Sequence, residues 1–235
     1  MGAGPGRILV RLIWSPPDVL GVRGFSSTRP RWVRQPFLFM TKAELRRDLR
    51  AVRNAFVAAR GGNHFAPMDA VTHIKSLARP ESIIAIYQCS TNECSSSFVT
   101  EVTPAAFALP CAKSKDERLV FRRWVVGDAL EMSPLGFLQP LSTAPKVTPS
   151  LIITPLLGFD HALNRLGQGA GHYDRAFEDF PNALRIGLAW SVQEVKSITT
   201  DLWDKPLDAV LTEKEWITAP SSRLDPPHDP RTIAS

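Results

Sequence analysis

The chain has 235 residues, of which 44% are hydrophobic and 22% charged, which is typical of a globular protein and excludes a disordered chain. No stretch approaches the about 18 to 20 uncharged apolar residues that a membrane span requires, so we expect no membrane partner. The three cysteines are too few and of the wrong parity for a disulfide framework, and no Cys or His pair has zinc-finger spacing. This cysteine usage favours a reducing compartment.

The net charge of +5 comes from residues 1–39, which hold six arginines, one aspartate and five prolines. The rest of the chain has 22 basic and 22 acidic residues, so it is not expected to bind nucleic acid through a basic surface. We expect residues 1–39 to be an unstructured leader. It is either an upstream extension before a true start at Met40, a mitochondrial transit peptide or a functional basic arm. The expected location is the cytoplasm, or the mitochondrial matrix if the leader is a transit peptide.

The first predicted element is an amphipathic helix that starts after Met40 and ends at the glycine pair 61–62. Thr41 can cap this helix, and Glu44 completes a capping box. Its apolar face carries Leu45, Leu49, Val52 and Phe56. Its other face carries Arg46, Arg47, Arg50 and Arg53, which spacing alone assigns to a solvated surface.

A second, weaker helix is predicted over about Met68–Leu77, and another around Gly171–Phe180. The predicted strands are Ile83–Tyr87, Leu119–Val126, Leu151–Pro155, Leu184–Trp190 and Asp208–Thr212. Strands separated by helices are typical of α/β proteins with a parallel sheet. We therefore predict one α/β domain over 40–218, with a central, largely parallel sheet flanked by helices in three Rossmann-like layers. Residues 219–235 are expected to form a disordered tail.

A glycine-rich turn precedes the helix predicted near residue 171. Gly167, Gly169 and Gly171 allow positive φ and let backbone N–H groups face an anion, which the following helix N-terminus also favours. Arg165 can contact a phosphate, and Asp174 can hold Mg²⁺ against phosphate oxygens. The turn fits neither the Rossmann fingerprint nor the Walker A pattern. Spacing alone therefore leaves open a phosphate site or an ordinary turn with a helix cap.

The same turn also carries a longer motif. Residues 165–175 read R-L-G-Q-G-A-G-H-Y-D-R after L-I-I-T-P-L-L-G-F-D, and this resembles the signature of the 5-formyltetrahydrofolate cyclo-ligases, also called methenyltetrahydrofolate synthetases. Further segments that resemble the family, in its order, are Lys42–Arg46, Ala85–Glu93, Phe121–Trp124 and Asp204–Glu213. The resemblance runs from about Met40 to Trp216, which favours the late start.

The resemblance implies an ATP-dependent ligase. Such an enzyme uses ATP and Mg²⁺ to convert 5-formyltetrahydrofolate into 5,10-methenyltetrahydrofolate, and releases ADP and phosphate. The expected partners are this folate and ATP, with neither nucleic acid nor membrane, and the chain is expected to be a monomer. No protein nucleophile is expected, because phosphoryl transfer depends mostly on positioning and charge neutralisation.

The resemblance also implies roles for individual residues. The expected ATP-binding residues are Lys42, Arg46, Arg165, Leu166, Gly167, Gln168, Gly169, Ala170, Gly171, His172 and Tyr173. The expected folate-binding residues are Glu93, Gln168, Gly169, Ala170, Gly171 and His172. Arg165 and Tyr173 are the expected catalytic residues, and Asp174 and Asp204 the expected Mg²⁺ ligands. Of the arginines on the first helix, only Arg46 then leaves the solvated face.

Several positions keep two interpretations. Asp204 is either a metal ligand or a loop acid before Pro206. His172 stands where many relatives carry an aromatic residue, so its ring either packs or acts as a general acid. Cys89 and Cys94 are expected to be small apolar residues and not reactive thiols.

The sequence also departs from the family pattern. The acid that often follows the glutamate of the folate loop is missing after Glu93, Gln139 replaces a frequent Glu, and Trp203 replaces a frequent His. The alternative function is therefore a catalytically weak relative that binds folate or ATP. A different phosphate-binding enzyme on the same fold is a second alternative, and ATP binding distinguishes it.

Overall fold

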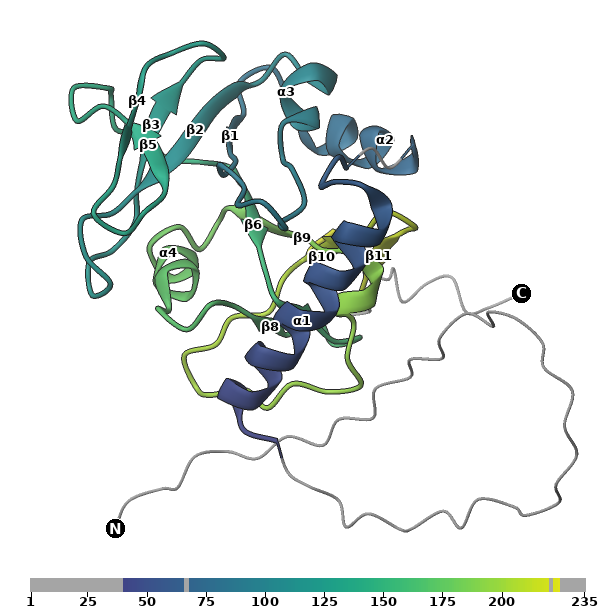
Figure 1. Cartoon of the computed structure of the whole chain (residues 1–235). Coiled ribbons are helices and arrows are strands. Elements are labelled where there is room, and N and C mark those ends of the chain that lie inside the picture. The colour runs from purple at the N-terminus through teal and green to yellow at the C-terminus, as the bar shows by residue number, and fades with distance from the viewer. Residues whose placement is uncertain (1–39, 66–67, 220–221, 225–235) are drawn as a thin grey trace, which may run out of the picture.

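A seven-stranded sheet is the centre of the computed structural model, which describes residues 40–65, 68–219 and 222–224 (Figure 1). Its strands are β1 (Ile83–Ala85), β2 (Ala106–Cys111), β3 (Val120–Trp124), β6 (Leu151–Pro155), β9 (Leu184–Leu188), β10 (Ala209–Leu211) and β11 (Trp216–Thr218). The order across the sheet is β11-β10-β9-β6-β1-β2-β3. The predictions made for residues 1–39 lie outside the described residues.

The helices and the two small strand pairs complete the architecture. The α-helices are α1 (Lys42–Arg60), α2 (Met68–Leu77), α3 (Phe98–Val102) and α4 (His172–Asp179). The strand pairs are β4 (Leu130–Met132) with β5 (Leu138–Pro140), and β7 (Gly158–Phe159) with β8 (Arg165–Leu166). The five inner strands of the large sheet run parallel, and β3 and β11 pair antiparallel at its two edges. The predicted α/β fold with a largely parallel sheet is confirmed.

All five predicted strands are present, and the sequence analysis missed two strands of the large sheet, the inner strand β2 and the edge strand β11. Pro110 lies inside β2, and proline normally argues against an inner strand because it lacks the N–H donor. The pairing of β2 with β1 ends at Ala108. Pro110 therefore lies beyond the last residue that β1 needs as a partner, which is why the strand tolerates it.

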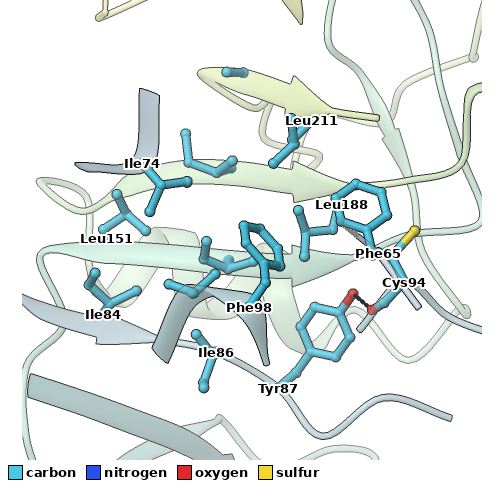
Figure 2. Packing of buried hydrophobic residues seen from close by; sticks show 14 of the residues in the cluster. Phe65, Ile74, Ile84, Ile86, Tyr87, Cys94, Phe98, Leu151, Leu188 and Leu211 are labelled. Carbon is cyan, nitrogen blue, oxygen red and sulfur yellow. Dashed lines mark hydrogen bonds between the residues drawn. The ribbon is translucent and has the colours of Figure 1, made fainter. Parts of the chain in front are cut away.

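Alternate residues of the strands pack on opposite faces of the sheet, as the two-residue period of a strand requires. On β6, Leu151 and Ile153 join one buried cluster and Ile152 joins the other. The first cluster lies under α2, α3 and the second half of α1, and Figure 2 shows part of it from close by. The second cluster is covered by α4 through Ala176 and Phe177. These faces give the three layers that the sequence predicted.

Helix α1 reaches beyond the sheet towards the glycine-rich turn. Thr41 and Glu44 form the predicted capping box at its start. Leu45 and Leu49 pack against Leu166 of β8 in a third buried cluster. This packing places the first half of α1 beside the turn that begins in β8.

The packed body continues past residue 218. Arg223 donates from Nε to Asp208 Oδ1 at 2.7 Å, and Leu224 packs against the first cluster. Residues 220–221 and 225–235 of the predicted tail lie outside the described residues. None of the helices in the part of the chain that the structure describes has the length and apolarity that a membrane crossing requires.

Candidate active site

A cavity of about 410 Å³ opens where β1, β2 and β6 end. Its walls include Tyr87 and Gln88 just after β1, Pro110 of β2 and Pro155 of β6. The carboxyl ends of parallel strands are where open α/β sheets bind their ligands. The volume is in the range of small-molecule sites. The cavity is therefore the candidate active site.

All residues for which the sequence predicted a binding, catalytic or metal role line this cavity. They are Lys42, Arg46, Glu93, Arg165, Leu166, Gly167, Gln168, Gly169, Ala170, Gly171, His172, Tyr173, Asp174 and Asp204. They come from α1, from the loop after β1, from the segment that runs from β8 into the first turn of α4, and from the loop before β10. The fold thus brings four segments that are far apart in the sequence to one place.

Lys42, the first residue of α1, is held by two carboxylates. Its Nζ lies 2.6 Å from Asp201 Oδ2 and 2.7 Å from Asp204 Oδ2. Burial lowers the pKa of Lys42, but the hydrogen bonds to Asp201 and Asp204 outweigh it, so the pKa lies above its ordinary value. Lys42 is therefore charged at physiological pH. Asp201 was not predicted, and its position three residues before Asp204 was its one sequence signal.

Arg165 and Asp174 form a second ion pair in the cavity. Arg165 Nη2 donates to Asp174 Oδ1 at 2.8 Å, and the Arg165 side chain is only 4% exposed. The guanidinium lies over the ring of Tyr173, with its Cζ 5.7 Å from the ring centroid. Burial raises the pKa of the Tyr173 hydroxyl above its ordinary value, so the hydroxyl stays protonated and can donate a hydrogen bond.

The glycine-rich turn has the backbone that the sequence predicted at two of its glycines. Gly169 has a φ of 110° and Gly171 a φ of 67°, both in the left-handed region. Gly171 is the N-cap of α4 and offers no side chain, so the first amides of this helix keep their donors for another partner. Arg46 donates from Nε to Gly167 O at 2.9 Å and so ties the turn to α1.

The Glu93 carboxylate accepts two hydrogen bonds and lies beside one arginine. Its Oε2 accepts the Ser90 N–H at 3.0 Å, and its Oε1 accepts from Gln168 Nε2 at 3.4 Å. Arg53 Nη1 lies 3.6 Å from the same Oε1. Gln168 Oε1 in turn accepts from Arg50. The turn and α1 together fix the carboxylate at the cavity wall.

The prediction that Arg53 is solvated is wrong. Its side chain is buried and points at Glu93, whereas the Arg47 side chain is 73% exposed and pairs with its neighbour Asp48. The spacing of four and three residues puts Arg46, Arg50 and Arg53 on one stripe of α1. This stripe faces the turn and the Glu93 loop, so it is a contact surface. The stripe is visible in the sequence, but its partner is not.

Comparison with known proteins agrees with this geometry. A family model described as the 5-formyltetrahydrofolate cyclo-ligase family matches residues 39–213. The chain belongs to this family. The 5-formyltetrahydrofolate cyclo-ligase of Haemophilus influenzae is 33% identical over 99 residues, which are 40% of this chain and 53% of that protein. The Escherichia coli K12 protein of the same name is 33% identical over 105 residues, 42% of this chain and 58% of that protein. The matched segment therefore spans little more than half the length of these relatives.

Two solved structures support the fold. The NMR structure of the Aquifex aeolicus 5,10-methenyltetrahydrofolate synthetase aligns with a TM-score of 0.60 at 22% identity, over 82% of this chain and 100% of that chain. The synthetase from Mycoplasma pneumoniae aligns with a TM-score of 0.53 at 21% identity, over 74% of this chain and 100% of that chain. At these identities the likeness shows the shared fold.

Some departures from the cyclo-ligase family pattern have a structural account. Gln139 accepts the Ala112 N–H and donates to Glu131, so it links β5 to the end of β2 and to β4. Trp203 is 67% exposed at the edge of the cavity. His172 Nε2 lies 3.2 Å from Ser114 O, which ties the ring to the loop after β2.

The cysteine near Glu93 has the surroundings of an unreactive thiol. Cys94 is buried, and burial raises the pKa of its thiol well above the ordinary value. Its backbone oxygen accepts from the Tyr87 hydroxyl at 2.6 Å (Figure 2). The hydrogen bond from Tyr87 thus fixes the position of the loop that carries Glu93. Cys89 is half-buried.

Proposed function

We propose that this member of the cyclo-ligase family uses ATP and Mg²⁺ to convert 5-formyltetrahydrofolate into 5,10-methenyltetrahydrofolate, with release of ADP and phosphate. The observation that carries the proposal is the convergence of the family's motif residues, from four distant segments, on one cavity at the strand ends. The names of the family and of the related proteins support the same activity.

The chemistry asks for positioning and charge neutralisation. The formyl oxygen of the substrate is a poor leaving group, so the γ-phosphoryl group is transferred to it as ADP departs. N10 of the folate then attacks the activated carbon and loses its proton, and the C–O bond breaks to release phosphate. No covalent bond to the protein forms in this sequence.

One end of the cavity, which we name the phosphate end, is lined by Lys42, Arg165 and the start of α4, and it suits a triphosphate. Lys42 and Arg165 are charged groups whose present partners are carboxylates, and phosphate oxygens can replace these partners. Nε of Arg165 is buried and has no hydrogen-bond partner among the described residues. The uncapped start of α4 adds backbone donors. We assign Arg165 and the Tyr173 hydroxyl to the transferred phosphoryl group, because both can donate to its oxygens.

The acids at this end suit Mg²⁺. In the described ranges, no three metal-ligating side chains gather in one cluster. A magnesium ion that binds with ATP needs only one or two carboxylates, because phosphates and waters supply the other oxygens. Asp174 and Asp204 have the right chemistry and line the cavity, so we assign them as the protein ligands. When bound, the metal neutralises charge on the phosphates.

Glu93 is assigned to the folate. An ionised carboxylate only accepts hydrogen bonds, and it has about four lone-pair positions. Ser90 and Gln168 use two of them, so acceptor positions remain for the N–H edge of the pterin. This assignment gives the two ends of the cavity different ligands.

The test is turnover by the full chain and by residues 40–235, with 5-formyltetrahydrofolate and Mg·ATP. The near-ultraviolet absorbance of the methenyl product is followed with and without ATP. We expect product from both proteins only when ATP and Mg²⁺ are present. Binding of both ligands without product would favour the catalytically weak relative. A folded protein that binds neither ligand would overturn the assignment of the cavity.

A further inference from the structure

We propose that Arg53 is a positioning residue for folate binding and acts through Glu93. The inference rests on the proposed function of the cavity. Arg53 is not one of the residues that line the cavity, whereas Glu93 is. Arg53 therefore acts on a ligand in the cavity through Glu93, which lies between Arg53 and the cavity.

The Arg53 guanidinium is buried, so its positive charge needs a compensating negative charge nearby. Its residue is only 5% exposed, and its Nε and Nη1 have no hydrogen-bond partner among the described residues. A buried cation is costly unless an opposite charge compensates it. Glu93 is the one carboxylate that the described part of the chain brings within 4 Å of it. The two charges are therefore mutually dependent.

The separation of the pair explains how Glu93 stays available to a ligand. The 3.6 Å between Arg53 Nη1 and Glu93 Oε1 is too long for a good hydrogen bond, so the contact is electrostatic. Arg53 thus compensates the charge of Glu93 without occupying one of its acceptor positions. Ser90 and Gln168 supply the orienting hydrogen bonds. Charge compensation and orientation come from different residues.

The sequence context makes the pair specific to one face of α1. Arg53 lies on the same stripe as Arg46, which contacts the glycine-rich turn, and Arg50, which contacts Gln168. The stripe therefore touches both proposed ligand ends. Of the three arginines, only Arg53 is buried behind the Glu93 carboxylate, which we assign to the folate. Loss of the Arg53 charge should therefore weaken the binding of folate and not that of ATP.

The experiment compares Arg53→Gln, Arg53→Lys, Glu93→Gln and the double variant Arg53→Gln/Glu93→Gln in the full chain. Affinity for 5-formyltetrahydrofolate and for Mg·ATP is measured separately by calorimetry, together with the KM of each. Arg53→Gln should weaken folate binding about tenfold and ATP binding by less than about twofold, and Arg53→Lys should restore most of the loss. Arg53→Gln should add little in the Glu93→Gln background. Arg47→Gln, on the exposed side of α1, is the matched control and should change neither affinity.

Three results would overturn the proposal. They are an unchanged folate affinity in folded Arg53→Gln, an equal loss for folate and ATP, and independent, multiplying effects of the two single substitutions. Thermal unfolding of each variant separates a structural role, which would lower the melting temperature without moving the affinities. Intact folate binding without turnover in the unmodified chain would overturn only the proposed reaction, since the coupling is read from binding.

Discussion

Replacing Asp174 by asparagine is expected to weaken the use of Mg·ATP by at least about tenfold. Asparagine keeps the size of the side chain and an oxygen for Arg165, which Asp174 now contacts at 2.8 Å. It removes the negative charge that a metal ion needs, so the loss should appear in kcat/KM for ATP and deepen at low Mg²⁺. Steady-state kinetics over a series of Mg²⁺ concentrations measures it.

The matched control is Asp179→Asn on the same helix. Asp179 also pairs with an arginine, Arg118, but it does not line the cavity. It should leave the kinetics unchanged. Turnover by Asp174→Asn at the unmodified rate, at limiting Mg²⁺, would contradict the metal role.

Replacing Lys42 by alanine is expected to raise the KM for ATP by at least about tenfold and to leave the fold intact. The change removes the proposed hydrogen-bond donor to the phosphates. It also leaves Asp201 and Asp204 without their cation, so both carboxylates would repel the phosphates. Because this repulsion is electrostatic and partly exposed, added salt should recover part of the loss. Initial rates at varied ATP and two ionic strengths measure the effect.

Lys75→Ala, an exposed lysine in the last turn of α2, is the control. It removes the same charge from the chain at a position outside the cavity. If Lys75→Ala raised the KM for ATP as much as Lys42→Ala, the effect would belong to net charge and not to the site.

Local patterns predicted the parts of the fold that local physics decides. The apolar β6 and the capped α1 are both recognisable from their own residues, because strand and helix periods differ. The small pairs β4–β5 and β7–β8 and the edge strand β11 were not predicted, because these two- and three-residue strands lack the continuous apolar run that marks the equally short β1 and β10. Pro110 concealed β2, because its fit depends on where a partner strand stops.

The residues of the candidate site were predicted through sequence motifs. What the prediction missed are pairings between distant segments. Every residue to which the motifs assigned a role lines the cavity, but the motifs could not show that Lys42 faces Asp201 as well as Asp204. It also could not show that Arg53 lies against Glu93, since a helix face is solvated or buried according to what packs on it. Such pairings are tertiary facts that periodicity does not contain.

The three ion pairs at the proposed phosphate end of the cavity have a kinetic consequence. Lys42, Arg46 and Arg165 provide three positive charges there, and Asp174, Asp201 and Asp204 provide three negative ones. This end therefore has no net charge to attract Mg·ATP over long distances, and the chain beyond residue 39 is neutral as well. The nucleotide would arrive by ordinary diffusion, at a rate nearly independent of ionic strength. Discrimination between nucleotides and other ligands would then occur after contact, when phosphate oxygens replace the carboxylates as partners of Lys42 and Arg165.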